Sequence, residues 1–273
     1  MKEIKLAYSD LYNAGDLMNI DIVEKLGNCK VIRRKSYNAE MLAIGGALIG
    51  LQYSENKIRR ACQRGARLIY GDKPIYIWGS GFLHDNNSNK FYRTNLHVCA
   101  LRGVKSQKKL CDLTGNFYDV LLADGGLLVD LLIDKVQFKK YKIGLIPHMW
   151  QQEEPAMMRM AKREDVHLIN IKQTPQEVAH EISLCETIAS SSLHGLVFAD
   201  SLHIPNIHII GRMNLRGGNF KFEDYYSSYG LDDNPCILDE HIPDYNEIVS
   251  LYRISIDMVE KKKKALVECF PKI

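Results

Sequence analysis

The sequence lacks a long apolar run and an excess of charge of one sign. No stretch of about 18 uninterrupted apolar residues occurs, so no membrane-spanning helix is predicted. The opening residues, MKEIKLAYSD, have no apolar centre of the kind that secretion signals carry, and we expect a cytoplasmic protein. The formal net charge is +3 and the lysines and arginines are scattered, so no nucleic-acid partner is expected.

Familiar motifs for metals, redox chemistry and nucleotides are also missing. The seven cysteines show no CxxC spacing and the nine histidines no HExxH spacing. Small, buried, reduced thiols are the simplest interpretation of the cysteines, with a zinc site or a cysteine nucleophile as alternatives. Neither a GxGxxG nor a Walker loop occurs, which argues against a dinucleotide or P-loop site. We therefore expect no metal and no bound cofactor.

Short apolar strands alternating with helical patterns are what the chain does contain. Strands are predicted at 4–8, 41–46, 74–81, 96–103, 117–126, 140–148, 166–171, 186–192 and 206–211. Helices are predicted between most of these strands, one of them capped by Thr174 with Pro175, Gln176 and Glu177 in its first turn. A long amphipathic helix over 245–267 closes the chain. This alternation indicates an α/β fold with parallel sheets covered by helices. It divides into two Rossmann-like units, 1–138 and 139–273, the second including the terminal helix.

Small and polar residues follow nearly every strand in the first unit. Ligands of open α/β sheets bind beyond the carboxyl ends of the strands, so the candidate residues are taken from there. The candidates are Asn13, Asp16, Gly46, Ser80, Arg102 and Ser106. Asp16 has the alternative role of a helix cap, and Arg102 that of a surface ion pair. Close packing of strand on helix explains the glycine turns equally well.

The second unit offers two histidines at strand ends. His148 follows a strand that breaks at Pro147. The stretch Ser190–His194 lies between a strand and a buried helix, with Ser191 or Ser192 as its cap. His194 then occupies the first helical turn, where the helix dipole lowers the imidazole pKa and favours anions. His203 is expected at the far end of that helix, outside the site.

Two polar segments complete the second unit. KFEDYYSSYG at 221–230, which begins with Lys221, is either a plain surface helix or a rim that holds a sugar ring. The run Lys261–Lys264 is interpreted as a solvated helix face, with contact to an anionic membrane surface as the alternative.

The motifs at the strand ends, taken in order, resemble the polysaccharide pyruvyl transferase family. They are NAGD (13–16), IGG (44–46), WGSG (78–81), LRGVKS (101–106), ADGGLL (123–128), IPH (146–148), SSSLHGLVFADSLHIPN (190–206) and KFEDYY (221–226). The resemblance covers almost the full length, and the last two motifs are the most specific. It implies a GT-B-like fold of two Rossmann-like lobes with the C-terminal helix packing across them.

The resemblance also implies an activity and roles for the candidate residues. The activity is transfer of pyruvate from phosphoenolpyruvate onto two hydroxyls of a sugar, in a polysaccharide or lipid-linked glycan precursor of capsule or exopolysaccharide. His194 is the first choice for the general acid and His148 the second, while Asp16 or Asp124 orients the acceptor hydroxyl. The expected substrate-binding residues are Asn13, Gly46, Ser80, Arg102, Ser106, Asp124, Ser191, Ser192 and Lys221. The expected location is the cytoplasm, including the inner face of the membrane.

Two departures from the family pattern leave alternatives open. Ser192 stands where some members carry arginine, which leaves Arg102, Lys221 and Arg212 as the candidate anion ligands. Ala123-Asp124-Gly125 stands where many members have Gly-Asp-Pro. One alternative function is a nucleotide-sugar glycosyltransferase, in which Glu223 or Asp224 binds the ribose. The other is a non-catalytic glycan-binding homologue, which the serine at 192 supports.

Overall fold

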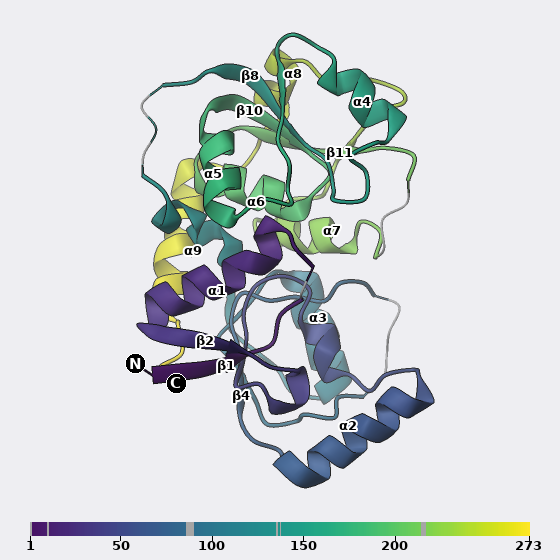
Figure 1. The fold of residues 1–273 in the computed structure, drawn as a ribbon, viewed down its shortest axis with the longest axis vertical. Helices are drawn as coiled ribbons and strands as arrows, with labels where there is room; N and C mark the ends of the chain where they lie inside the picture. The colour runs from purple at the N-terminus through teal and green to yellow at the C-terminus, as the bar shows by residue number, and fades with distance from the viewer. Residues whose placement is uncertain (1, 10, 86–89, 135, 137, 214–216) are drawn as a thin grey trace.

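Two five-stranded parallel sheets form the framework of the protein (Figure 1). The computed structural model describes residues 2–9, 11–85, 90–134, 136, 138–213 and 217–273. The first sheet has the order β2-β1-β3-β4-β5, from β1 (Lys2–Leu6), β2 (Cys29–Arg33), β3 (Met41–Leu42), β4 (Ile75–Ile77) and β5 (Leu96–Val98). The second has the order β12-β11-β10-β8-β9, from β8 (Tyr141–Ile146), β9 (Val166–Leu168), β10 (Cys185–Ser190), β11 (Asn206–Ile210) and β12 (Cys236–Ile237).

Helices cover both sheets, and a two-stranded sheet of β6 (Ala100–Leu101) and β7 (Leu121–Leu122) extends the first half. The α-helices of the first half are α1 (Ala14–Gly27), α2 (Lys57–Tyr70) and α3 (Val104–Thr114). Those of the second half are α4 (Pro155–Ala161), α5 (Pro175–Ser183), α6 (Leu193–Ser201), α7 (Phe220–Ser227), α8 (Tyr245–Leu251) and α9 (Ile256–Glu268). Short 3₁₀ segments are η1 (Ser36–Asn38), η2 (Leu48–Leu51) and η3 (Gly125–Leu132).

The predicted α/β class with parallel sheets is confirmed, and local sequence explains several of its elements. The central strands β8 and β10 are buried over most of their length, as expected for parallel strands covered on both faces. Helix α5 begins with the predicted cap. Thr174 and Glu177 form a reciprocal capping box, and Pro175 stands in the first turn.

The predicted helix over 245–267 is wrong in its middle, where the structure has two helices. Helix α8 ends at Leu251, and α9 starts only after Ser255, whose side chain accepts a hydrogen bond from the backbone of Met258. Between them the hydroxyl of Tyr252 donates to the buried carboxylate of Asp200, 2.8 Å away. This tertiary contact fixes extended backbone at Tyr252 where the amphipathic pattern favoured helix.

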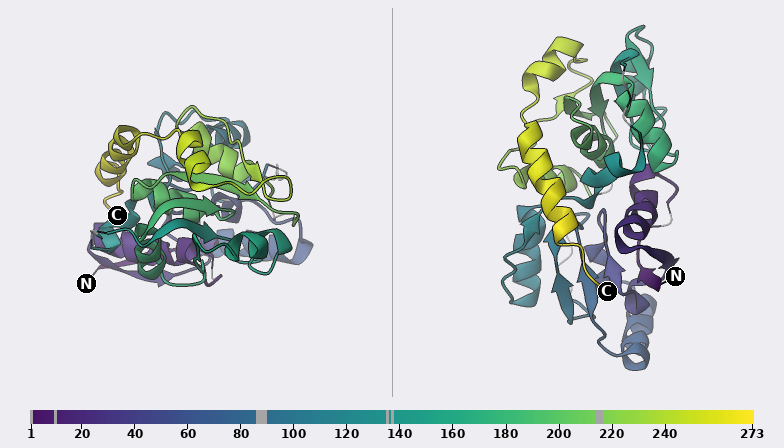
Figure 2. Two further views of the ribbon diagram at one scale, coloured as in Figure 1. Left: turned by 90° about the horizontal axis from the view of Figure 1, so that it is seen from above. Right: turned by 90° about the vertical axis from the view of Figure 1, so that its left-hand side faces the viewer.

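One apolar core connects the two sheets. It runs from Ile4 and Leu6 of β1 through α1 and η3 to α6 and Ile188 of β10. Helix α9 passes from the second half down to the first sheet (Figure 2), where the backbone oxygen of Leu266 accepts a hydrogen bond from Trp78 Nε1 at 3.0 Å. Each sheet falls within one of the predicted units, and their status as separate domains stays a prediction.

The lysine run near the C-terminus lies on α9 and only half of it faces solvent. Lys263 is buried, and its ammonium group contacts Asp130 and the backbone oxygen of Ser201. Lys262 donates to the backbone oxygens of Leu122 and Ser228. The expectation of a four-lysine solvated face is therefore wrong for these two residues. Within the described ranges no helix is both long and apolar enough to cross a bilayer.

The cysteines are free thiols in the structure. The prediction that they are buried holds for Cys29 and Cys185, whereas Cys62 is exposed on α2 and the others are half-buried. Among the described residues, no three histidine, cysteine or acidic side chains lie close enough together to hold a metal ion.

Candidate active site

A cavity of about 530 Å³ lies where the carboxyl ends of the two sheets face each other. Its walls come from the segments at the ends of β1, β2, β3 and β6 in the first half and of β8, β9 and β10 in the second, with one side chain from α7. This is the edge at which parallel sheets bind ligands. The predicted residues on its wall are Asn13, Asp16, Gly46, Arg102, His148, Ser192, His194 and Lys221.

His194 lies in the first turn of α6 with its ring pressed against the start of α1. A Cβ added at Gly15 would lie 1.9 Å from Nδ1 of His194, so the imidazole occupies the space that any larger residue would need. Nε2 of His194 is buried and has no hydrogen-bond partner among the described residues. Gly15 of the NAGD motif therefore leaves the space that the ring of His194 occupies, which explains the glycine at this position.

The imidazole of His194 is held neutral. Burial, with the cations of Lys221 and Arg102 as further causes, lowers its pKa to about 3. The sequence predicted the direction, but burial rather than the helix dipole is the main cause. Because two cations contribute, an anion bound beside them would weaken the repulsion and raise this pKa.

Lys221 brings a buried ammonium group to the same wall. It lies in the first turn of α7 and is 9% exposed. Burial and, to a smaller extent, the Arg102 cation lower its pKa to about 8, although Asp16 partly opposes both effects. The side chain is thus an under-neutralised cation that faces the cavity, and binding of an anion would favour its charged form.

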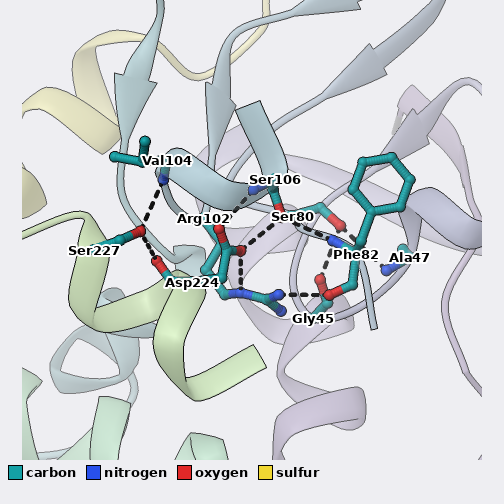
Figure 3. A network of polar contacts seen from close by, with 9 residues as sticks. All are labelled: Gly45, Ala47, Ser80, Phe82, Arg102, Val104, Ser106, Asp224 and Ser227. Atoms are coloured by element: carbon teal, nitrogen blue, oxygen red, sulfur yellow. Dashed lines mark hydrogen bonds and ion pairs between the residues drawn. The ribbon is translucent and has the colours of Figure 1, made fainter. Parts of the chain in front are cut away.

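Arg102 is fixed in place by a buried ion pair (Figure 3). Its Nε lies 2.8 Å from Asp224 Oδ2, and its Nη2 donates to the backbone oxygen of Phe82 at 2.6 Å. The side chains of both partners in the pair are almost fully buried, so the alternative of a surface ion pair is wrong. Nη1 has no hydrogen-bond partner within the described ranges, and the residue lines the cavity.

Asp224 also caps helix α3, as Figure 3 shows. Its carboxylate accepts hydrogen bonds from the backbone N–H of Ser106 at 2.7 Å and from the Ser106 hydroxyl at 2.6 Å. Gly103 allows this approach, since a Cβ there would lie 1.7 Å from the backbone oxygen of Asp224. The start of α3, where Ser106 was expected to bind substrate, is therefore already occupied by a carboxylate of the protein itself.

The KFEDYY segment is largely interior, so its interpretation as a plain surface helix is wrong. Phe222, Asp224 and Tyr225 are buried, and Tyr225 donates to Asp200. Asp224 has no free oxygen directed at a ligand ribose, and Glu223 forms an exposed ion pair with Lys105. The residues offered for a nucleotide-sugar site are therefore engaged elsewhere.

Four predicted residues lie behind the cavity wall and support its loops. Ser80 donates to the backbone oxygen of Gly45 at 3.0 Å, and Ser191 accepts from the backbone N–H of His148 at 2.9 Å. Ser106 holds Asp224, as described above. Asp124 caps η3, and burial raises its pKa to about 6. Contact between these four and a substrate stays a prediction.

His148 and Asp16 flank His194 on the wall. His148 is half-buried, and burial, with Lys221 as a second cause, lowers its pKa to about 4. Asp16 accepts a hydrogen bond from the side chain of Asn13, which caps α1. Asp16 thus takes part in the helix cap, the alternative proposed for it, while still lining the cavity.

Three basic residues on the outer wall were not predicted. Arg33 ends β2 and Arg34 and Lys35 follow it, and this strand was not among the predicted ones. All three are exposed at the cavity. Arg212, named as a possible anion ligand, is exposed and pairs with Asp239 at 2.6 Å, and it is not among the wall residues.

Comparison with known proteins agrees with the arrangement of these motifs. Residues 13–211 match the polysaccharide pyruvyl transferase family. The "Uncharacterized protein L143" of Acanthamoeba polyphaga mimivirus is 27% identical over 283 residues, which cover 97% of this chain and 90% of that protein. The family match spans well over half of the sequence and includes the NAGD motif, Arg102, His148 and His194. The chain belongs to the polysaccharide pyruvyl transferase family.

Proposed function

We propose that the protein transfers pyruvate from phosphoenolpyruvate to two hydroxyls of a sugar, forming a cyclic ketal and releasing phosphate. The observation that carries the proposal is the setting of His194. Its Nε2 is buried without a partner, and the cavity it lines also holds the cations of Arg102 and Lys221. An acid–base group beside two cations suits a substrate that is both anionic and activated by a proton.

Phosphoenolpyruvate brings a phosphate and a carboxylate, and both need cationic partners in a partly buried cavity. Lys221 and the free Nη1 of Arg102 are the proposed partners, with the first turn of α6 as a further source of positive potential. In this scheme Lys221 and Arg102 fill the role that arginine has in some members at the place of Ser192.

Binding of phosphoenolpyruvate would promote the protonation of His194. Without ligand, His194 is neutral because of burial and the two neighbouring cations. The negative charges of phosphoenolpyruvate would offset Lys221 and Arg102, raise the imidazole pKa and allow a proton to bind. The general acid would then be formed only when phosphoenolpyruvate is in place, which limits wasteful proton transfer.

The proposed reaction begins with a proton passing from His194 to the methylene carbon of phosphoenolpyruvate, which becomes a methyl group. The positive charge that develops at the second carbon is shared with the ester oxygen, and one sugar hydroxyl attacks there. The carbon–oxygen bond to phosphate then breaks, and the neighbouring hydroxyl closes the ketal. Of the two hydroxyl protons released, one restores His194 and the other leaves with phosphate. Asp16 or His148 would orient the hydroxyls.

The acceptor would occupy the outer part of the cavity, in a sugar chain that is free or lipid-linked. The wall there comes from the first half of the chain and includes Asn13, Gly46 and the segment 33–35. The inner wall has His194 and Lys221 from the second half, and Arg102 reaches it from the first. Donor and acceptor thus meet between the two halves, as expected of a GT-B-like pair of Rossmann-like lobes, and we include this arrangement in the proposal.

Release of phosphate from phosphoenolpyruvate in the presence of an acceptor tests the proposal. A panel of lipid-linked and free glycans would be screened by mass spectrometry for the mass of one added ketal. His194→Gln should abolish turnover and leave the fold intact. His203→Asn is the matched control, because His203 lies at the far end of the same helix and its left-handed backbone tolerates asparagine. Turnover by the His194 variant close to that of the control would refute the assignment.

A further inference from the structure

Helix α2 turns its apolar side away from the protein. The residues Ile58, Leu68 and Ile69 are 76%, 87% and 78% exposed. They lie on one stripe of the helix together with Ala61 and Cys62, at spacings of three, four and seven residues. Ala66 is the buried residue of this helix. In an ordinary surface helix the apolar stripe faces the core, so the orientation here is inverted.

The rest of α2 is strongly basic. Its sequence, KIRRACQRGARLIY, contains five basic residues and no acidic residue. Arg60 and Arg67 face the body, where they donate to the backbone oxygens of Ser54 and Tyr92. Arg59 and Arg64 are exposed beside the apolar stripe and form no ion pair among the described residues. A helix with exposed leucine and isoleucine between free arginines has the composition of a membrane-surface helix.

Helix α2 lies where a flat surface can contact it without obstruction. The helix lies at one end of the long axis of the molecule, outside the first sheet (Figure 1). It is about 21 Å long at 1.5 Å per residue. Tyr70 at its end stacks on Tyr37 of η1, with ring centroids 5.8 Å apart. Since η1 directly follows Arg33, Arg34 and Lys35, this stacking joins the end of α2 to the segment that brings three basic residues to the cavity wall.

We propose that α2 docks on an anionic lipid surface, with its apolar stripe in the acyl boundary and its arginines on the headgroups. Charge complementarity selects this occupant. A second copy of the chain would bring two helices of like charge together, which is unfavourable. A nucleic acid would gain nothing from a stripe of leucine and isoleucine, because phosphates and base edges need polar partners. This proposal stands independently of the proposed reaction, since docking needs no substrate.

Co-sedimentation with lipid vesicles tests the docking surface. The full chain should bind vesicles of phosphatidylcholine mixed with phosphatidylglycerol at least tenfold more tightly than vesicles of phosphatidylcholine alone, and salt should weaken the binding. Replacing Leu68→Ser together with Ile69→Ser should reduce the binding at least tenfold. Phe117→Ser is the control, because Phe117 is an exposed apolar side chain elsewhere, at 82% exposure. Equal loss in this control would overturn the proposal.

A second pair of variants tests the charge. Arg59→Ser with Arg64→Ser should also lose at least tenfold in binding. Lys261→Ser with Lys264→Ser removes the same charge from exposed positions of α9 and should bind like the unmodified chain. Failure of the unmodified chain to bind anionic vesicles would overturn the proposal, as would equal losses in the two pairs. A dimer in sedimentation analysis that the Leu68 and Ile69 changes dissociate would assign the face to self-association instead.

Discussion

Removing the carboxylate of Asp224 is expected to destabilise the protein strongly. In Asp224→Ala, the buried guanidinium of Arg102 loses its counter-charge, and the N-terminal turn of α3 loses the acceptor for the N–H of Ser106. Breaking a buried ion pair costs about 3–5 kcal/mol, and loss of a helix cap about 1 kcal/mol. These contacts are coupled, so we expect a loss of about 4 kcal/mol. That is a large part of a typical total stability of about 5–15 kcal/mol.

Two further variants separate charge from hydrogen bonding. Asp224→Asn keeps an acceptor for the N–H of Ser106 but leaves Arg102 uncompensated, and we expect a loss of about 3 kcal/mol. Combining Arg102→Met with Asp224→Leu removes both charges and should destabilise less than Asp224→Ala, because no buried charge is left unpaired. Glu223→Ala, next in the same helix, removes only an exposed partner of Lys105 and should cost less than about 1 kcal/mol.

Equilibrium unfolding in urea measures these losses. The fluorescence of Trp78 and Trp150 and the far-ultraviolet circular dichroism signal provide two probes, and coincident transitions would support a two-state treatment. A loss below about 1 kcal/mol in Asp224→Ala would refute the reasoning, because it would mean that the pair is solvated or replaceable. So would a double variant less stable than Asp224→Ala.

Three further predictions follow from the cavity and from α9. In Gly15→Ala the new methyl group displaces the ring of His194, so turnover should fall by roughly a hundredfold while binding of phosphoenolpyruvate is retained. Unchanged turnover would show that the ring does not need the space that Gly15 leaves. Lys221 is cationic below its pKa of about 8, so calorimetric affinity for phosphoenolpyruvate should fall as pH rises through that value. Lys221→Arg should flatten this dependence, and its persistence would implicate another group. Trp78→Phe leaves the backbone oxygen of Leu266 with only the weak thiol donor of Cys269 and should cost about 2 kcal/mol in urea unfolding, whereas a neutral effect would show that the indole hydrogen bond is dispensable.

The sequence was most informative where structure depends on nearby residues. The start of α5 was predicted from Thr174, Pro175 and Glu177 because a capping box involves only four consecutive positions. The parallel sheets followed from the alternation of strands and helices. The edge that carries the cavity followed from the same topology, and most predicted residues at the strand ends do line it.

The sequence was least informative where a contact joins distant segments. Arg102 and Asp224 are 122 residues apart, so no local pattern indicated that Asp224 neutralises Arg102 and caps α3. Helix α2 was not among the predicted elements, and its pattern alone would not have told which side faces solvent. Likewise, the break between α8 and α9 depends on the contact of Tyr252 with Asp200, which no local rule encodes.

The crossing of α9 affects how the chain can fold during synthesis. Trp78 is fully buried, its N–H bonds to the backbone of Leu266, and Phe270 packs edge-on against its ring with centroids 5.2 Å apart. The first sheet therefore completes its core with residues made almost 190 positions later than Trp78. Since domains usually fold from the N-terminus as the ribosome proceeds, this chain would wait for its final helix, with Trp78 exposed to chaperones in the meantime.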